Sequence, residues 1–207
     1  VEWLGDEGLL SVRQDASRNC LIARVDGPAS AHLPALVPRL RRMFDLDLDP
    51  QELHAALDGD PWLGRLLLQT PGLRVPGTWS TFELIVRTIV GQQVSVKAAT
   101  TIAGRLAERA GQPVSKPHHP QVAWQFPTPI ALAEVDLERI GMPGKRVAAL
   151  QNFAAAVAHN QVQIEAFPDE RTRTDLAPLR QGLLALPGIG PWTVEYVAMR
   201  AWRDTDA

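Results

Sequence analysis

The stretch LPGIGPWT, from Leu186 to Thr193, separates two segments whose apolar residues recur at helical spacing. Gly188 and Gly190 lack a Cβ, so both can adopt positive φ and present a backbone N–H to a ligand. The apolar Ile189 between them is expected to point into the helix pair. Pro191 is well suited to begin the second helix, because the first residue of a helix has no use for its N–H. The stretch therefore predicts a tight hairpin between two helices.

This hairpin also has the chemistry of an anion site. The first amides of a helix that begins at Pro191 have no partner within the helix, and they lie at the positive end of its dipole. A phosphate beside Gly188 and Gly190 would accept hydrogen bonds from these amides, with the Thr193 hydroxyl as a further donor. The alternative is that LPGIG is an ordinary turn in a structural helical bundle.

Composition limits the remaining possibilities. The chain has 207 residues, 45% of them hydrophobic and 21% charged, which is typical of a folded globular protein. The formal net charge is −2, so a polyanionic partner must be bound by a local arrangement of donors. The single cysteine, Cys20, excludes an intrachain disulfide, a four-cysteine iron–sulfur cluster and a cysteine-based zinc site. The sequence shows no export signal and no apolar run of about 18 residues, so we expect a cytoplasmic protein without a membrane partner.

The order of predicted elements indicates an α+β fold. A small N-terminal domain of antiparallel sheet plus helices is expected over residues 1–70, and an all-α domain over 71–207. The boundary is placed at the Pro- and Gly-rich stretch Thr70–Gly77. Strands are expected at 9–12 and 20–25, and helices at 32–44, 50–57, 61–69, 82–90, 94–110, 129–135, 136–140, 143–159, 174–186 and 191–202.

The hairpin resembles that of the helix-hairpin-helix DNA glycosylases, in which it is followed by a Gly/Pro-rich loop and an Asp. Bifunctional members carry a nucleophilic Lys two residues after the last hairpin glycine. This chain has Trp192 at that position. The resemblance therefore implies a monofunctional enzyme, and the missing cysteine cluster argues against the endonuclease III-like and adenine-mismatch branches.

Further motifs resemble the 3-methyladenine DNA glycosylase II, or alkylation-repair, branch. They are Val75–Gly77 followed by Phe82-Glu83, the run IVGQQVSV at 89–96, FPTP at 126–129 and GMPGKR at 141–146. The resemblance covers essentially the whole chain. It implies a monomer that flips alkylated purines out of double-stranded DNA and excises them by hydrolysis during base excision repair, in association with the nucleoid. No organic cofactor is implied.

The resemblance also implies roles for individual residues. Trp192 and Tyr196, one helical turn apart, would stack on the flipped base, and a cationic purine favours aromatic faces. Gln93 matches the wedge that fills the gap left by that base, although a relative in this branch has an apolar residue there. Lys145 and Arg146, at a helix start, would contact phosphate; a solvated basic pair is the alternative. Trp202 is expected in the core.

Two further expectations follow from the resemblance. Backbone carbonyls around Leu184, Leu186 and Ile189 would bind a structural Na⁺ or K⁺. The family's catalytic Asp follows the segment corresponding to Arg200–Trp202, and Asp204 and Asp206 precede its position, so we expect the Asp beyond Ala207 and the chain to be truncated at both ends.

The sequence leaves two alternative functions open. A non-enzymatic helix-hairpin-helix DNA-binding module would share Gly188 and Gly190 without needing an aromatic pocket. A chain that lacks the catalytic Asp would bind damaged DNA without excising the base.

Overall fold

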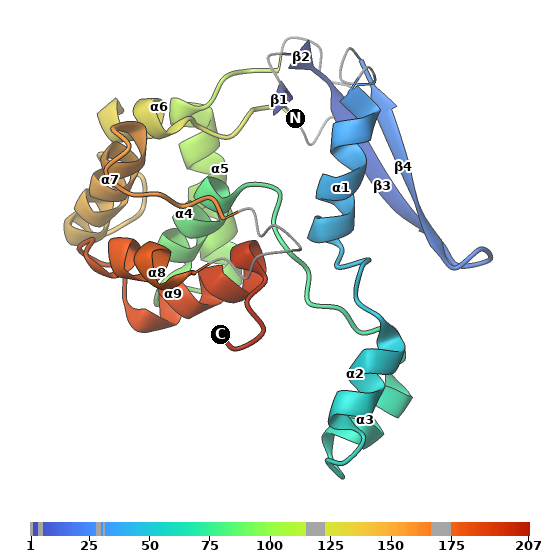
Figure 1. Ribbon diagram of the computed structural model, residues 1–207. Helices are drawn as coiled ribbons and strands as arrows, with labels where there is room; N and C mark the ends of the chain where they lie inside the picture. Colours follow the sequence, from blue (N-terminus) through green and yellow to red (C-terminus); the bar gives the residue numbers. More distant parts are fainter. Residues whose placement is uncertain (1, 4–5, 28–29, 31, 115–122, 167–174) are drawn as a thin grey trace.

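The computed structural model describes residues 2–3, 6–27, 30, 32–114, 123–166 and 175–207 (Figure 1). The chain begins with two antiparallel strand pairs. β1 (Glu2–Trp3) pairs with β2 (Asp6–Glu7), and β3 (Leu9–Asp15) pairs with β4 (Cys20–Asp26) in a register that places Leu9 opposite Asp26. The two predicted strands are confirmed as an antiparallel pair, and both extend past their expected ends.

Side-chain chemistry closes the turn between β3 and β4. The Asp15 carboxylate accepts hydrogen bonds from the Ser17 backbone N–H at 3.1 Å and from the Ser17 hydroxyl at 2.6 Å, and these bonds lower the pKa of Asp15. Asn19 adopts the left-handed conformation with φ 49°, which Asn tolerates better than most residues. The turn residues thus make their own hydrogen bonds.

Three helices follow the strands. α1 (Leu33–Met43) buries Leu36 against Val25 and Trp79. α2 (Pro50–Leu57) begins after Asp49, whose carboxylate accepts from the Gln51 N–H at 2.8 Å, a typical N-cap. α3 (Leu63–Gln69) completes the group. Figure 1 shows α2 and α3 below α1, apart from the other helices.

The remaining helices form a body around α4 (Thr81–Gly91). Ser80 caps α4 by accepting from the Glu83 N–H at 3.2 Å, and Ile85, Val86 and Ile89 are completely buried. The helices that complete the body are α5 (Val96–Ala110), α6 (Pro129–Glu134), α7 (Gly144–Ala158), α8 (Ala177–Leu184) and α9 (Pro191–Val197), which continues as a π-helical turn (Ala198–Trp202). α4 packs against α5, α7 and α9, so it holds the elements of the C-terminal half together. None of the described helices is long and apolar enough to cross a membrane.

Contacts between distant segments join α1 to the helical body. The Gly77 N–H donates to the Met43 carbonyl at 2.8 Å, and a Cβ on residue 77 would lie 2.7 Å from the Arg42 carbonyl oxygen. Arg203 forms an ion pair with the buried Asp45 at 2.6 Å. The two residues are left-handed, with φ 58° and 51°. The expected division at residue 70 stays a prediction.

One predicted helix is wrong. Residues 136–140 form a turn, in which the Asp136 carboxylate accepts from the Glu138 N–H at 2.8 Å and Arg139 has φ 59°. Arg109 of α5 donates to the carbonyls of Asp136 and Glu138 at 3.3 and 2.6 Å. In a helix, these carbonyls would accept from backbone N–H groups of the same helix; here they accept from the Arg109 side chain instead. The other helices occur with ends shifted by a few residues, and the N-terminal end predicted for 174–186 lies outside the described residues.

Candidate functional site

The hairpin between α8 and α9 depends on one glycine more than the other. Gly188 has φ 84°, and a Cβ there would lie 2.7 Å from the Ala149 Cβ of α7. Gly190 has φ −102° as the N-cap of α9, and a Cβ there would meet nothing within 4 Å. Only Gly188 therefore uses the positive φ that the sequence allowed at both positions.

The residues beside these glycines point inward. Ile189 is buried, as predicted, and its N–H donates to the Leu186 carbonyl at 3.2 Å. Thr193 is only 3% exposed, because it lies on the face of α9 that packs into the core. The residue therefore has little accessible surface for the phosphate contact that was expected of its hydroxyl.

Aromatic rings line the next turn of α9. The Trp192 and Tyr196 rings are stacked, with centroids 5.2 Å apart and an interplanar angle of 8°. Trp192 is 69% exposed, so its other face is open to solvent. Arg200 lies over the Tyr196 ring at 5.4 Å and donates to the Tyr196 hydroxyl at 2.7 Å. Because the two rings already touch, no further ring fits between them, and the face that stays open is the outer face of Trp192.

Arg200 also fixes this stack to another segment. Its guanidinium donates to the carbonyls of Pro76 and Gly77 in the linker before α4. Trp192, Tyr196 and Arg200 follow one another at i, i+4 and i+8, a spacing that places side chains on one helix face. That spacing is the signal by which the role of Arg200 could have been found from sequence.

The loop after α4 lies against the hairpin. The Gln92 side-chain amide donates to the Gly188 carbonyl at 3.2 Å. Gln93, the predicted wedge, is exposed and left-handed with φ 57°, and its Oε1 accepts from Nη2 of Arg146 at 3.5 Å. Lys145 is exposed. The structure thus brings the loop, the start of α7 and the hairpin together, and the contact made by Gln92 was not predicted.

Asp204, which follows the π-helical turn, belongs to an ion-pair network. Arg180 of α8 contacts Glu195 at 2.8 Å and Asp204 at 2.6 Å. The hydrogen bonds that Arg180 donates to Glu195 and Asp204 raise the pKa of Arg180 above its ordinary value. Asp204 is thus engaged in joining α8 to the segment after the π-helical turn. Asp206 is exposed.

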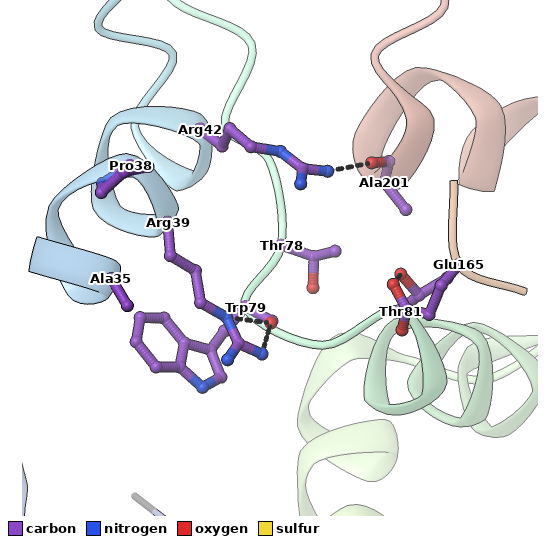
Figure 2. Close-up of a pocket in the computed structure, with 9 residues that line it drawn as sticks. All are labelled: Ala35, Pro38, Arg39, Arg42, Thr78, Trp79, Thr81, Glu165 and Ala201. Carbon is purple, nitrogen blue, oxygen red and sulfur yellow. Dashed lines mark hydrogen bonds between the residues drawn. The ribbon is translucent and has the colours of Figure 1, made fainter. Parts of the chain in front are cut away.

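A cavity of about 530 Å³ lies elsewhere, between α1, residues 78–81 and the π-helical turn (Figure 2). Arg39 donates to the Trp79 carbonyl and lies over the Trp79 ring at 4.2 Å. Thr81 donates to Glu165 at 3.0 Å. Burial lowers the pKa of Arg39, while Glu165 acts in the opposite direction. Figure 2 shows Arg39 bonded to the Trp79 carbonyl and Arg42 bonded to the Ala201 carbonyl, so side chains of α1 join the segment before α4 to the π-helical turn.

Comparison with known proteins places this arrangement in a family. The family model of the AlkA N-terminal domain matches residues 1–80. The chain is 33% identical over 202 residues to DNA-3-methyladenine glycosylase 2 of Escherichia coli, covering 96% of this chain and 66% of the relative. It is 40% identical over 169 residues to a probable bifunctional transcriptional activator/DNA repair enzyme AlkA of Mycobacterium tuberculosis, covering 82% of this chain and 33% of the relative.

The chain belongs to the 3-methyladenine DNA glycosylase II branch of the helix-hairpin-helix superfamily. Its fold agrees with that assignment. A 3-methyladenine DNA glycosylase structure from Archaeoglobus fulgidus superposes with a TM-score of 0.77 at 22% identity, covering 99% of this chain and 67% of that one. The chain spans a third of the length of the mycobacterial relative and about two thirds of the E. coli relative.

The structure places several of the predicted site residues close to the hairpin. Trp192 and Tyr196 follow the hairpin, the Gln92-Gln93 loop lies beside it, and Trp202 is buried, with its Nε1 donating to the Ile164 carbonyl at 2.9 Å. The roles of the proposed contacts stay predictions. Among the described residues, no group of three or more His, Cys, Asp and Glu side chains could hold a metal ion.

Proposed function

We propose that this chain forms the DNA-binding and base-recognition part of a monofunctional DNA glycosylase. The enzyme would flip alkylated purines of the 3-methyladenine type out of double-stranded DNA and excise them by hydrolysis in base excision repair. It would act as a monomer in the cytoplasm, on nucleoid DNA. The open face of Trp192, supported from behind by Tyr196 and placed beside the hairpin, is the observation that carries the proposal.

The aromatic stack suits a flipped, positively charged base. A base that leaves the duplex loses its stacking, and the loss is smallest for damaged or weakened pairs. The flipped base can stack on the exposed face of Trp192 in place of one neighbour in the duplex. The ring quadrupole favours a cationic base over a neutral one. Arg200 holds Tyr196 through its hydroxyl, so the supporting ring does not have to be ordered when the base arrives.

The backbone at the hairpin would position the duplex. Amides at Gly188, at Gly190 and at the start of α9 can donate to a phosphate. Lys145, which precedes Arg146 in the sequence, is exposed and adds a positive charge. Carbonyl oxygens of Leu184, Leu186 and Ile189 are neutral, hard donors of the kind that Na⁺ or K⁺ prefers. The Leu186 carbonyl already accepts from Ile189 and keeps a second lone pair for a cation. A cation there would add positive charge to the phosphate site.

Hydrolysis of the glycosidic bond needs little acid catalysis here, because an alkylated purine leaves as a neutral base. It needs a carboxylate to stabilise the positive sugar and to orient water. Asp204 is paired with Arg180 and is not proposed for that role. No lyase step is expected, because Trp192 occupies the position of the amine nucleophile.

The test is release of free 3-methyladenine from methylated duplex DNA by the protein as the cell produces it. We expect release by the wild type, a loss of at least tenfold in Trp192→Ala, and little change in Asp204→Asn. A wild-type protein that releases no base would overturn the enzymatic proposal.

A second candidate is that residues 1–207 by themselves bind damaged DNA without catalysis. The engagement of Asp204 with Arg180 favours it, because that pair leaves this carboxylate no free position at the site. Duplexes with an abasic-site analogue would then bind more tightly than intact duplexes. Neither the wild type nor Trp192→Ala would release free 3-methyladenine. Equal affinity for both duplexes would instead indicate a general DNA-binding module.

A further inference from the structure

The Arg146 side chain is turned toward the Gln93 loop, although its position at the start of α7 led us to expect a phosphate contact. Its Nη2 donates to Gln93 Oε1 at 3.5 Å. Its Nη1 is buried, and no acceptor among the described residues lies within hydrogen-bond distance of it. Lys145, the neighbouring residue, is exposed. The two cations therefore face different surroundings.

Both ends of this contact are unfavourable for the free protein. A buried donor without a partner loses its hydration and gains no hydrogen bond. Gln93 is held at φ 57°, a left-handed conformation that side chains with a Cβ rarely adopt. Neither feature stabilises the fold. Two features that each raise the free energy of the folded state occur at one contact, which indicates that the arrangement serves binding and not stability.

The neighbouring residue keeps the loop in place. Gln92 donates to the Gly188 carbonyl at 3.2 Å, so the backbone at Gln93 is tied to the hairpin. With the backbone fixed, the remaining freedom of Gln93 is in its side chain. Arg146 is the group that contacts that side chain's amide.

The chemistry of guanidinium decides which way this amide faces. Arginine has five N–H donors and no acceptor, so only the oxygen of the Gln93 amide can face it. The Nε2 group, with its two N–H donors, is then left for another partner. Without Arg146, the amide could rotate and present either its oxygen or its nitrogen.

We propose that Arg146 is a positioning residue that fixes the Gln93 amide so that its N–H donors face the base left unpaired when a damaged base is flipped. The inference rests on the proposed function, because it takes Gln93 as the wedge. An unpaired pyrimidine offers carbonyl oxygens as acceptors for these donors. Arg146 would then set a preference for an unpaired base with acceptors over one without them.

Binding measurements test this without requiring excision. The probes are two fluorescent duplexes with a tetrahydrofuran abasic-site analogue opposite either thymine or difluorotoluene, which has the shape of thymine but lacks its strong acceptors. We expect wild-type protein to bind the thymine duplex roughly three- to tenfold more tightly, the effect of about one hydrogen bond. Arg146→Met should reduce this preference, because the amide is then free to turn, and Arg146→Lys should restore part of it, since an ammonium can also donate to Oε1.

Two further variants complete the test. Lys145→Met should weaken both duplexes by the same factor and keep the preference, as expected for a phosphate contact. Gln93→Leu should lose the preference, and adding Arg146→Met to it should change the ratio no further. The proposal is overturned if Arg146→Met keeps the wild-type ratio of the two duplex affinities, or if the wild type binds both duplexes equally well. Failure of the enzymatic proposal shows separately, as absence of base release.

Discussion

The Cα of Gly188 faces α7 so closely that a Cβ on it would lie 2.7 Å from the Cβ of Ala149. Gly188→Ala must therefore move one of two packed segments while holding a positive φ, and we expect it to lower the free energy of unfolding by about 2–3 kcal/mol. Denaturant titration measures this. Gly190→Ala is the matched control, with an expected loss below about 1 kcal/mol. Equal losses would contradict the structural distinction between the glycines.

The two tryptophans of the last helical segment predict opposite phenotypes. Trp192→Phe removes part of an exposed ring, so we expect weaker binding of damaged DNA with stability changed by less than about 0.5 kcal/mol. Trp202→Phe removes a buried indole and its bond to the Ile164 carbonyl, so we expect a loss of about 2 kcal/mol. Parallel denaturation and binding assays check both. Destabilisation by the change at 192 would show that this ring is part of the core.

Arg180 is expected to contribute to stability at every pH at which proteins are usually studied. Arg180→Met leaves Glu195 and Asp204 without their shared partner, which should cost about 2 kcal/mol at these partly exposed positions. Because folding raises the pKa of Arg180, its contribution is complete below the ordinary arginine pKa and is lost only above it. Unfolding measured at pH 6 and pH 9 should give the same difference between wild type and variant.

Lys145 is expected to contribute charge without contributing stability. Lys145→Gln should lower the slope of log affinity against log salt by about one, the effect of one phosphate contact. Arg65→Gln, an exposed change on α3, is the matched control and should leave the slope unchanged. A slope unaffected by the change at 145 would rule out a phosphate contact there.

The sequence was most informative where the chemistry is local. The positive φ of Gly188 and the burial of Ile189 were predicted because both follow from the local hairpin sequence, whereas the close approach of Ala149 to Gly188 was not. Residues 136–140 were predicted incorrectly as a helix, because the carbonyls they offer are taken by Arg109 from another element. Burial of the Thr193 hydroxyl also depends on packing, which the hairpin motif does not contain.

Contacts between distant segments explain what could not be predicted at the site. Gln92 and Gly188 are 96 residues apart, and Gln93 and Arg146 are 53 apart. No periodicity in one sequence relates such positions. The face shared by Trp192, Tyr196 and Arg200 is different, because helical spacing alone places them together.

The ion pair between Asp45 and Arg203 closes a loop of 158 residues, which has a consequence for the order of folding. Strand pairing in β3 and β4 and the turns of each helix join near neighbours and form in microseconds, whereas closing this loop costs more chain entropy. We expect α1 to dock onto a helical body that has already formed. Loss of the pair would then speed unfolding far more than it slows folding, so this contact delays the separation of α1 from the helical body.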